Sequence, residues 1–352
     1  MKLSRRSLLI NSAIATAGFT ATQVFRPRRA QAQTQAGVVN LYSSRHYNTD
    51  DELYETFTEL TGIRVNLLEG KADELLERIK NEGENSPADV FMTVDAGRLW
   101  RAEQAGVFAS TTSTTLSNNI PENLQHPEGK WFGFSKRARV IMYNKDTVDP
   151  SELSTYEDLA DPKWQGKILI RSSGNIYNQS LVASLIAANG LEATEEWAKG
   201  FVSNFARDPE GNDRAQIEAA AAGLGELAIA NTYYLPRYAK DEDPAKQAIF
   251  DKIGVFFPNQ DDRGVHVNIS GAGVVASAPH ANEAKQFLEY LSGTEAQAFF
   301  AQGNNEYPVV EDAALDPVVE GFGSFKDDPL NVDTFGENQA AAVQLMDRVG
   351  WT

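Results

Sequence analysis

The chain has 352 residues, and its 49 acidic and 32 basic side chains give a formal net charge of −17 at pH 7, which makes nucleic acid and anionic membrane surfaces poor partners. It contains no cysteine, so disulfides, thiolate zinc sites, iron–sulfur clusters and thiol catalysis are excluded. A chain of this length can bury a large core, and we expect two lobes rather than one small domain.

The N-terminal stretch 1–32 predicts a secretory signal peptide. A basic start leads into a short apolar run and the small-residue site AQA at 30–32. The pair Arg5-Arg6 is typical of twin-arginine signals. Cleavage near Ala32 would remove six basic and no acidic residues and change the net charge from −17 to −23. We therefore expect a soluble periplasmic protein, exported by the twin-arginine translocase.

Strands and helices alternate in the first third of the chain after this signal. Strands are predicted at 38–44, 63–70 and 87–95, and helices at 48–62, 72–83 and 96–106. Asn48 or Thr49 is the expected cap of the first helix, and Gly62 its end. The polar stretch 111–119 is predicted to be a loop. This alternation favours an α/β sheet with parallel strand pairing.

Two long strand-rich stretches, 131–146 and 264–278, are predicted to cross between the two lobes. The lobe boundaries that follow are 36–134 with 271–307 for the N-terminal lobe, and 135–270 with 308–352 for the C-terminal lobe. Other segments are predicted as helices at 178–190, 193–205, 214–225, 280–293, 294–302 and 335–351, a strand at 226–232, and a helix, turn and strand across 155–172. Crossing strands form a hinge, and the cleft between the lobes is a natural ligand site.

Five aromatic side chains follow predicted strands. His46 and Tyr47 follow the first strand, Tyr177 lies in a predicted loop just before the helix at 178–190, and the adjacent pair Tyr233 and Tyr234 follows the strand at 226–232. Ligands of open α/β sheets bind beyond the carboxyl ends of the strands. We therefore expect these side chains to meet. Two adjacent tyrosines can reach one point only where the backbone turns.

One imidazole and four phenols would form a hard, oxygen-rich metal site. A phenol has a pKa near 10, so only a strongly Lewis-acidic cation such as Fe(III) deprotonates several together. Calcium would call for carboxylates and carbonyls, and zinc for histidine and cysteine. Four phenolates exceed the charge of Fe(III) by one. The arginines available to offset the excess are Arg45, Arg137, Arg139 and Arg237, of which we favour Arg45, Arg137 and Arg237.

The chain resembles the cyanobacterial Fut-type proteins of the ferric-binding-protein family, which are substrate-binding proteins of ABC transporters. The resemblance runs through LYSSRHYNTDDELYETFTELTGI, PADVFMTVDAGRLWRAEQAG, WFGFSKRARVIMYNK, YEDLADPKWQGKI and GNDRAQIEAAAAGLGELAIANTYYLPRY. It implies a two-lobe periplasmic-binding-protein fold, and iron bound at His46, Tyr47, Tyr177, Tyr233 and Tyr234. It also implies delivery to an ABC permease driven by a cytoplasmic ATPase. We expect a monomer.

Three alternatives stay open at this stage. The same fold binds small organic or phosphorylated ligands in some relatives, and the stretch RSSGN at 171–175 offers hydroxyls and backbone N–H groups for a phosphate. A site that tolerates Fe(II) would use the same five residues. An enzyme is disfavoured, because the chain has no G-x-S-x-G elbow, P-loop or H-E-x-x-H motif. Only four histidines are present, and nothing places one in a Ser-His-Asp arrangement.

Overall fold

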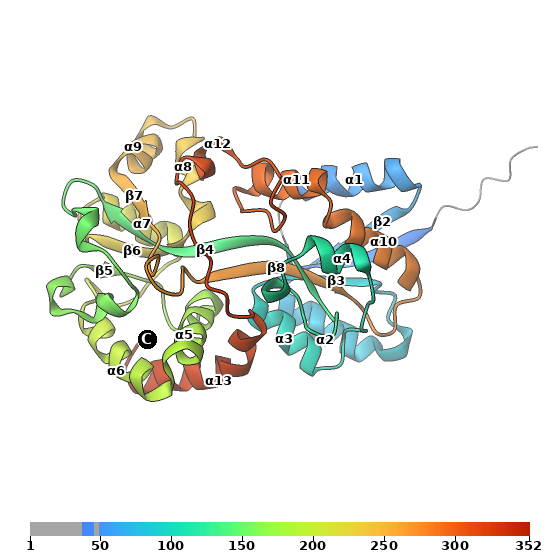
Figure 1. Ribbon diagram of the computed structural model, residues 1–352, viewed down its shortest axis with the longest axis horizontal. Coiled ribbons are helices and arrows are strands. Elements are labelled where there is room, and N and C mark those ends of the chain that lie inside the picture. The colour runs from blue at the N-terminus through green and yellow to red at the C-terminus, as the bar shows by residue number, and fades with distance from the viewer. Residues whose placement is uncertain (1–36, 46–48) are drawn as a thin grey trace, which may run out of the picture. The chain divides into compact units, whose positions relative to one another are not determined.

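The computed structural model describes residues 37–45 and 49–352, and residues 36–352 form one compact unit. The predicted signal peptide and the predicted ligands His46 and Tyr47 lie outside the described residues. Within the described part, no helix is both long and apolar enough to cross a membrane. The chain has a mixed α/β fold (Figure 1), which confirms the predicted fold class.

One mixed sheet runs through the fold in the order β2-β1-β3-β8-β4-β6-β5, with β7 paired to β4. The strands are β1 (Val38–Ser43), β2 (Arg64–Glu69), β3 (Val90–Val94), β4 (Phe132–Asn144), β5 (Ile168–Leu169), β6 (Leu227–Asn231), β7 (Ile253–Phe256) and β8 (Val267–Val274). The pairs β1–β2, β1–β3 and β5–β6 are parallel, whereas β4 and β8 are antiparallel to their neighbours. The prediction of parallel pairing therefore holds at both ends of the sheet but not at its centre.

The stretches predicted to cross between two lobes form the two long central strands β4 and β8; the division into lobes stays a prediction. The first half of β4 pairs with β8, with Arg137 opposite Asn268, and its second half pairs with β6 and β7. Both strands are buried almost throughout. Gly271 of β8 allows close packing there, because a Cβ at this position would lie 2.7 Å from the carbonyl oxygen of Phe132.

The helices lie on both faces of the sheet (Figure 1). They are α1 (Asp50–Thr61), α2 (Ala72–Glu82), α3 (Ala96–Gln104), α4 (Thr114–Asn119), α5 (Ile176–Asn189), α6 (Leu191–Ser203), α7 (Asp213–Ala221), α8 (Pro236–Ala239), α9 (Pro244–Lys252), α10 (Ala281–Leu291), α11 (Thr294–Asn304), α12 (Pro317–Glu320) and α13 (Asp333–Arg348). Gly62 ends α1 in the left-handed region, at φ 75°, as predicted. The hydroxyl of Thr49 does not cap α1; it donates instead to Asn304 Oδ1 at 2.9 Å.

Three local predictions were wrong. The stretch predicted as a polar loop at 111–119 contains the helix α4, because Ser113 accepts a hydrogen bond from the N–H of Leu116 and Leu116 packs into the core. The helix predicted within 155–172 is two 3₁₀ turns, Glu157–Ala160 and Pro162–Trp164, since Pro162 interrupts it. Tyr177 lies inside the first turn of α5 rather than before the helix, because Asn175 is the cap and accepts from the N–H of Tyr177.

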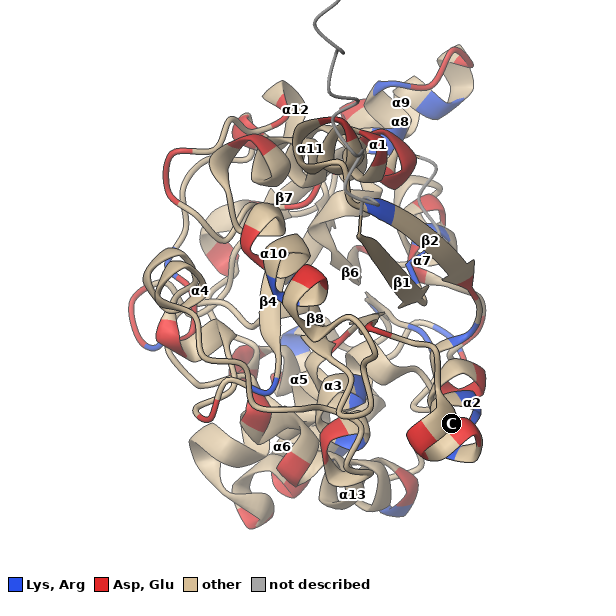
Figure 2. Cartoon of the chain, turned by 90° about the vertical axis from the view of Figure 1, so that its right-hand side faces the viewer, with Lys and Arg blue, Asp and Glu red and all other residues tan. Residues whose placement is uncertain are grey.

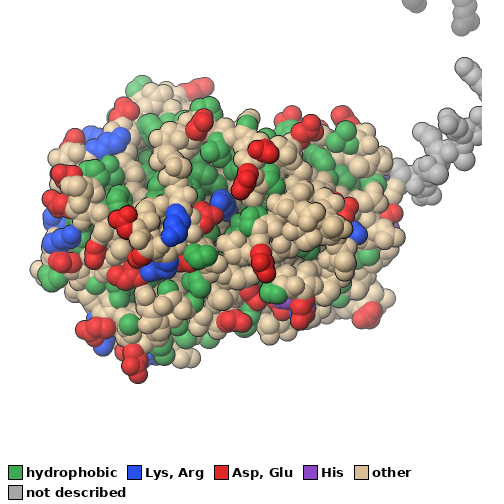
Figure 3. Space-filling model, viewed as in Figure 1, with side chains coloured by type: hydrophobic (Ala, Val, Ile, Leu, Met, Phe, Trp, Pro, Cys, Tyr) green, Lys and Arg blue, Asp and Glu red, His purple; other side chains and the backbone are tan. Residues whose placement is uncertain are grey.

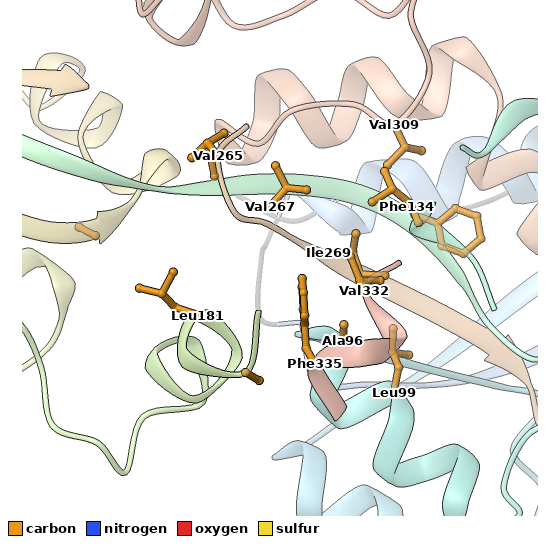
Figure 4. Close-up of a cluster of buried hydrophobic side chains, with 14 of the residues drawn as sticks. Ala96, Leu99, Phe134, Leu181, Val265, Val267, Ile269, Val309, Val332 and Phe335 are labelled. Carbon is orange, nitrogen blue, oxygen red and sulfur yellow. The ribbon is translucent and has the colours of Figure 1, made fainter. Parts of the chain in front are cut away.

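The core continues without a break beneath the crossing strands. Apolar side chains from both crossing strands meet others from α3, α5 and α13 there (Figure 4). The helix α13 contacts both α5 and α3, and Gly336 makes this possible, because a Cβ there would lie 2.1 Å from Cγ of Trp100. The C-terminal Trp351 is buried against Phe201 and Phe205. Side chains at the crossing are therefore fixed by packing from several elements at once.

Charged side chains occupy the outer faces of the helices. Figure 2 shows acidic residues along α1, where Asp51 and Glu52 of the first turn are exposed while Asp50 is buried. On the face shown in Figure 3, basic side chains are scattered among acidic ones rather than gathered into one patch. This distribution fits the acidic composition of the chain.

Candidate metal centre

Tyr177 and Tyr233 bring their hydroxyl groups together from separate parts of the chain. Tyr177 is the second residue of α5, and Tyr233 lies in a 3₁₀ turn directly after β6. The strands that precede them, β5 and β6, are parallel neighbours, so their carboxyl ends meet at the same edge of the sheet. The hydroxyl of Tyr233 donates to the hydroxyl of Tyr177 at 3.3 Å. Two of the predicted ligand oxygens are thus at hydrogen-bonding distance.

The backbone turns at Tyr233 and Tyr234, which is the condition for two adjacent tyrosines to reach one point. Residues Thr232–Tyr234 form one 3₁₀ turn, which is followed at once by the short helix α8. The ring centroids of Tyr233 and Tyr234 are 4.3 Å apart, with 40° between the ring planes. Tyr233 is buried and Tyr234 is half-buried. The 3₁₀ turn therefore keeps the two rings together, whereas strand geometry would have sent them to opposite faces.

Three arginines surround these rings. The guanidinium of Arg237, in α8, lies 5.8 Å from the ring centroid of Tyr233 and 5.9 Å from that of Tyr234. Arg171 and Arg139 lie 5.7 and 6.0 Å from the ring of Tyr177. Arg237 was predicted to be near the metal, whereas Arg139 was only considered and Arg171 was missed. Positive charge on several sides of the phenols favours their ionised form.

A buried carboxylate holds two of these arginines. Asp213, the first residue of α7, is fully buried and lies 3.2 Å from Nη1 of Arg139 and 3.6 Å from Nη1 of Arg171. Arg139 also donates to Asn178 at 2.6 Å and to Asn231 at 3.1 Å. Only a weak signal for this network is present in the sequence: Arg139 follows Arg137 by two residues, so both side chains point to the same face of β4.

Tyr234 is protonated in the metal-free site. Burial raises the pKa of Tyr234 to about 12, and the neighbouring Tyr177 and Asp213 also raise it, while the hydrogen bond with Tyr233 and the charge of Arg171 act in the opposite direction. At pH 7 the phenol of Tyr234 is therefore neutral. A ligand that needs the phenolate must release a proton on binding.

The other two predicted arginines lie deeper in the fold. Arg45 is buried; its Nε lies 2.8 Å from Oδ2 of Asp50 and its Nη1 lies 3.1 Å from Oε2 of Glu306. Arg137 is also buried and donates from Nη2 to Oγ of Ser270 at 3.3 Å. Their role toward a metal stays a prediction.

A second group of possible metal ligands, Glu103, His126 and Asp333, offers three ligand atoms within 4.8 Å of one another. Nε2 of His126 lies 3.1 Å from Oε2 of Glu103, whose other oxygen lies 3.1 Å from Nζ of Lys130. Nδ1 of His126 accepts from the N–H of Glu128 at 2.9 Å, so the proton of a neutral ring is on Nε2. A neutral ring therefore presents an N–H, not a lone pair, toward Glu103, and this tautomer does not suit a metal ligand.

The described tyrosines form a set of hard oxygen donors. The phenols of Tyr177, Tyr233 and Tyr234 lie together beside arginines. The chain segments that carry these tyrosines do not supply the carboxylates that calcium or magnesium would need. Phenolate oxygens prefer hard, highly charged cations. The geometry thus suits Fe(III) better than a divalent metal.

Comparison with known proteins agrees with this chemistry. The family model described as "bacterial extracellular solute-binding protein" matches residues 85–322. The chain is 61% identical over 313 residues to iron uptake protein A1 of Synechocystis, covering 89% of this chain and 87% of that one. It is 30% identical over 324 residues to the Fe(3+)-binding periplasmic protein of Serratia marcescens, covering 91% and 93%. The structure of Trichodesmium IdiA (FutA) in complex with iron and citrate ligands matches with a TM-score of 0.88 and 63% identity, covering 90% of this chain and all of that one.

Proposed function

Because the chain belongs to the bacterial extracellular solute-binding protein family, in the group that includes the cyanobacterial iron uptake proteins, we propose that it binds Fe(III) through tyrosinates and delivers it to an ABC permease. The proposed ligands are His46, Tyr47, Tyr177, Tyr233 and Tyr234. The positive charges of Arg45, Arg137 and Arg237 offset the excess negative charge of the phenolates. The protein acts by binding and handover, not by catalysis.

One observation supports this proposal above the others: the hydroxyl groups of Tyr177 and Tyr233 lie 3.3 Å apart although 56 residues separate them in the chain. Packing alone gives no reason to place two phenol oxygens at one point. A shared cation does, because each phenolate then contributes to a single coordination sphere. The adjacent ring of Tyr234 supplies a third oxygen to the same region.

Export and handover complete the proposal. The N-terminal residues 1–32 direct the protein through the twin-arginine translocase to the periplasm, where it acts as a soluble monomer. Segments 36–134 with 271–307 and 135–270 with 308–352 form two lobes that close on the metal, with β4 and β8 as the hinge. Iron bridges the lobes and stabilises the closed state. The permease, driven by its cytoplasmic ATPase, then recognises the loaded form.

A visible absorption titration of the metal-free protein with chelated Fe(III) tests the proposal. Phenolate bound to Fe(III) gives an intense charge-transfer band, so we expect colour that saturates at one iron per chain. The double variant Tyr233→Phe/Tyr234→Phe should lose the band and bind iron severely more weakly, because two ligand oxygens are removed. Tyr238→Phe is the matched control, since its hydroxyl donates to Glu218 and lies outside the proposed ligand set.

The possible results separate the candidate functions. If the wild-type protein stays colourless but binds Fe(II), the proposed oxidation state of the bound iron is wrong and the cargo is Fe(II). Protein that ignores both forms of iron but is stabilised by a phosphorylated organic compound would favour the alternative ligand class. If the double variant bound iron as wild type does, the tyrosines would be packing residues and the proposed site would be wrong.

A further inference from the structure

A short segment at the end of α11 contacts residues next to both groups of proposed ligands. It consists of Asn304, Asn305 and Glu306, and we call it the 304–306 turn. All three side chains are buried, with 3%, 5% and 0% of their surface exposed. Asn305 ends α11 in the left-handed region at φ 59°, so the chain reverses here and neighbouring side chains point in different directions. This inference rests on the proposed function and adds a positioning role to it.

On one side, the 304–306 turn binds the residues that flank His46 and Tyr47. Asn304 Oδ1 accepts from the hydroxyl of Thr49 at 2.9 Å, and its Nδ2 donates to Oδ1 of Asp50 at 3.1 Å. Glu306 pairs with Nη1 of Arg45 at 3.1 Å, and Arg45 pairs in turn with Asp50 at 2.8 Å. The residues immediately before and after the segment 46–48 are thus both tied to the 304–306 turn.

On the other side, the 304–306 turn binds the residue that ends α8. Nζ of Lys240 donates to Oδ1 of Asn305 and to Oδ2 of Asp316, the cap of α12. The helix α8 begins two residues after Tyr234 and carries Arg237 beside both tyrosine rings. In Figure 1, α11 lies beside α1, and α12 lies beside α8. Lys240 therefore fixes the far end of the helix that positions Tyr233 and Tyr234.

The 304–306 turn itself is held in place by the crossing strand β4. Tyr307 exchanges two backbone hydrogen bonds of 2.8 Å with Lys136, and Ser135 donates to Oε2 of Glu306 at 2.9 Å. Asn304, Asn305 and Glu306 are buried and have little room to rearrange separately. The link to α8 runs through Lys240, whose side chain is 39% exposed. A displacement of the 304–306 turn on one side is therefore passed to the other through these contacts.

We propose that the 304–306 turn is a positioning element which links Arg45, Thr49 and Asp50 to the segment 233–240 when the proposed lobes are closed on iron, and so sets the rate at which iron is released. Its side chains do not contact the metal in this scheme. Removing the contact of Lys240 or of Asn304 leaves every ligand in place but loosens one segment relative to the other. Iron should then leave faster from a site of unchanged chemistry.

Three variants test this in the full chain: Lys240→Met, Asn304→Ala and the combination of both. Lys246→Met is the matched control, because Lys246, on the neighbouring α9, makes a solvent-accessible ion pair with Asp241. Lys240→Arg is the rescue variant, since it keeps the charge and the reach. Two readouts are measured: loss of the charge-transfer band in excess chelator, and amide hydrogen exchange of the metal-free protein over 43–52 and 231–240.

Each single variant should release iron roughly five- to tenfold faster, since a hydrogen bond to a charged group is lost, while the position of the band and the melting temperature stay close to wild type. The double variant should release iron more slowly than the product of the two single-variant effects predicts, because both substitutions act through the same 304–306 turn. Lys240→Arg should restore the wild-type rate of iron release. Amide exchange over 231–240 should rise in the two variants that carry Lys240→Met and stay unchanged in Asn304→Ala.

The proposal is overturned if both single variants release iron at the wild-type rate, if Lys246→Met accelerates release as much as Lys240→Met, or if the effects of the single variants multiply in the double variant. Wild-type protein that binds no iron would instead refute the proposed function. In that case the exchange data alone decide, and unchanged exchange over 231–240 in Lys240→Met overturns the positioning role.

Discussion

Proton release on iron binding gives the sharpest test of the site. The three described phenols of Tyr177, Tyr233 and Tyr234 lie together, and a phenol with a pKa near 10 or above is fully protonated between pH 6 and 8. Each phenol that ligates Fe(III) must therefore lose one proton throughout this range. Three protons per iron make the dissociation constant rise about a thousandfold for each unit by which the pH falls. The proposed ligand Tyr47 contributes a fourth proton, so the expected rise for the whole site is about ten-thousandfold.

The free energies involved are large enough to dominate the affinity. The pKa of Tyr234 is about 12, so ionising it at pH 7 costs about 7 kcal/mol, against about 4 kcal/mol for an unperturbed phenol. The cation must supply this free energy at each ligand. Weakly Lewis-acidic metals cannot do so for three phenols, and the raised pKa therefore increases the preference for Fe(III) over divalent metals.

The assay is competition for iron with a chelator of known proton dependence, at half-unit steps from pH 6 to 8, followed by the charge-transfer band. With the four proposed tyrosine ligands, Tyr234→Phe should reduce the slope from about four to about three decades per pH unit. Tyr238→Phe, whose hydroxyl bonds to Glu218, should leave the slope unchanged. A wild-type slope of one decade or less would refute a tyrosinate site with three phenolates.

Three further predictions concern stability, measured by urea unfolding. Burial and the charges of nearby arginines lower the pKa of His266 to about 3. The free energy of unfolding is therefore unaffected by this ring above pH 6.5 and falls by at most about 1.4 kcal/mol per pH unit as the pH drops toward 3. The stability of a His266→Gln variant should depend less steeply on acid pH, and a pH dependence identical to wild type would contradict this reasoning. Trp351→Ala should cost about 3–5 kcal/mol through the cavity left beside its aromatic neighbours, whereas Val343→Ala, at a site 41% exposed, should change stability by less than about 1 kcal/mol. Gly336→Ala should cost about 1–3 kcal/mol because the new Cβ would collide with Trp100, and an unchanged midpoint would show that α13 moves freely relative to α3.

The sequence predicted most elements of the fold because the signals are local. Alternating apolar segments and glycine stops placed β1, α1, β2, α2, β3 and α3 within a few residues of their observed bounds. The failures were also local: Ser113 caps a helix in a stretch too polar to suggest one, and Asn175 starts α5 early enough to include Tyr177. Short capping interactions of this kind override the polarity of a segment.

Some features of the candidate site could likewise be predicted from the sequence, and others could not. The types of its residues, and their positions after strands, could be read from the chain, since strand ends in α/β sheets are where ligands bind. The arginine and carboxylate network around Tyr177 could not, because Arg171 and Asp213 are ordinary surface-type residues in the sequence and become buried partners only through the packing of α7 against β6.

The sequence by itself thus determined the α/β class and the two long central strands, and it predicted phenols as the donors. Only the tertiary structure decided that the hydroxyls of Tyr177 and Tyr233 meet, and that the 304–306 turn lies between the segments that follow β1 and β6. The physical reason is that local patterns fix backbone conformation, whereas distances between segments far apart in the chain depend on which strands pair and in which register. The parallel pairing of β5 with β6 fixed the first distance. The backbone pairing of Tyr307 with Lys136 fixed the second.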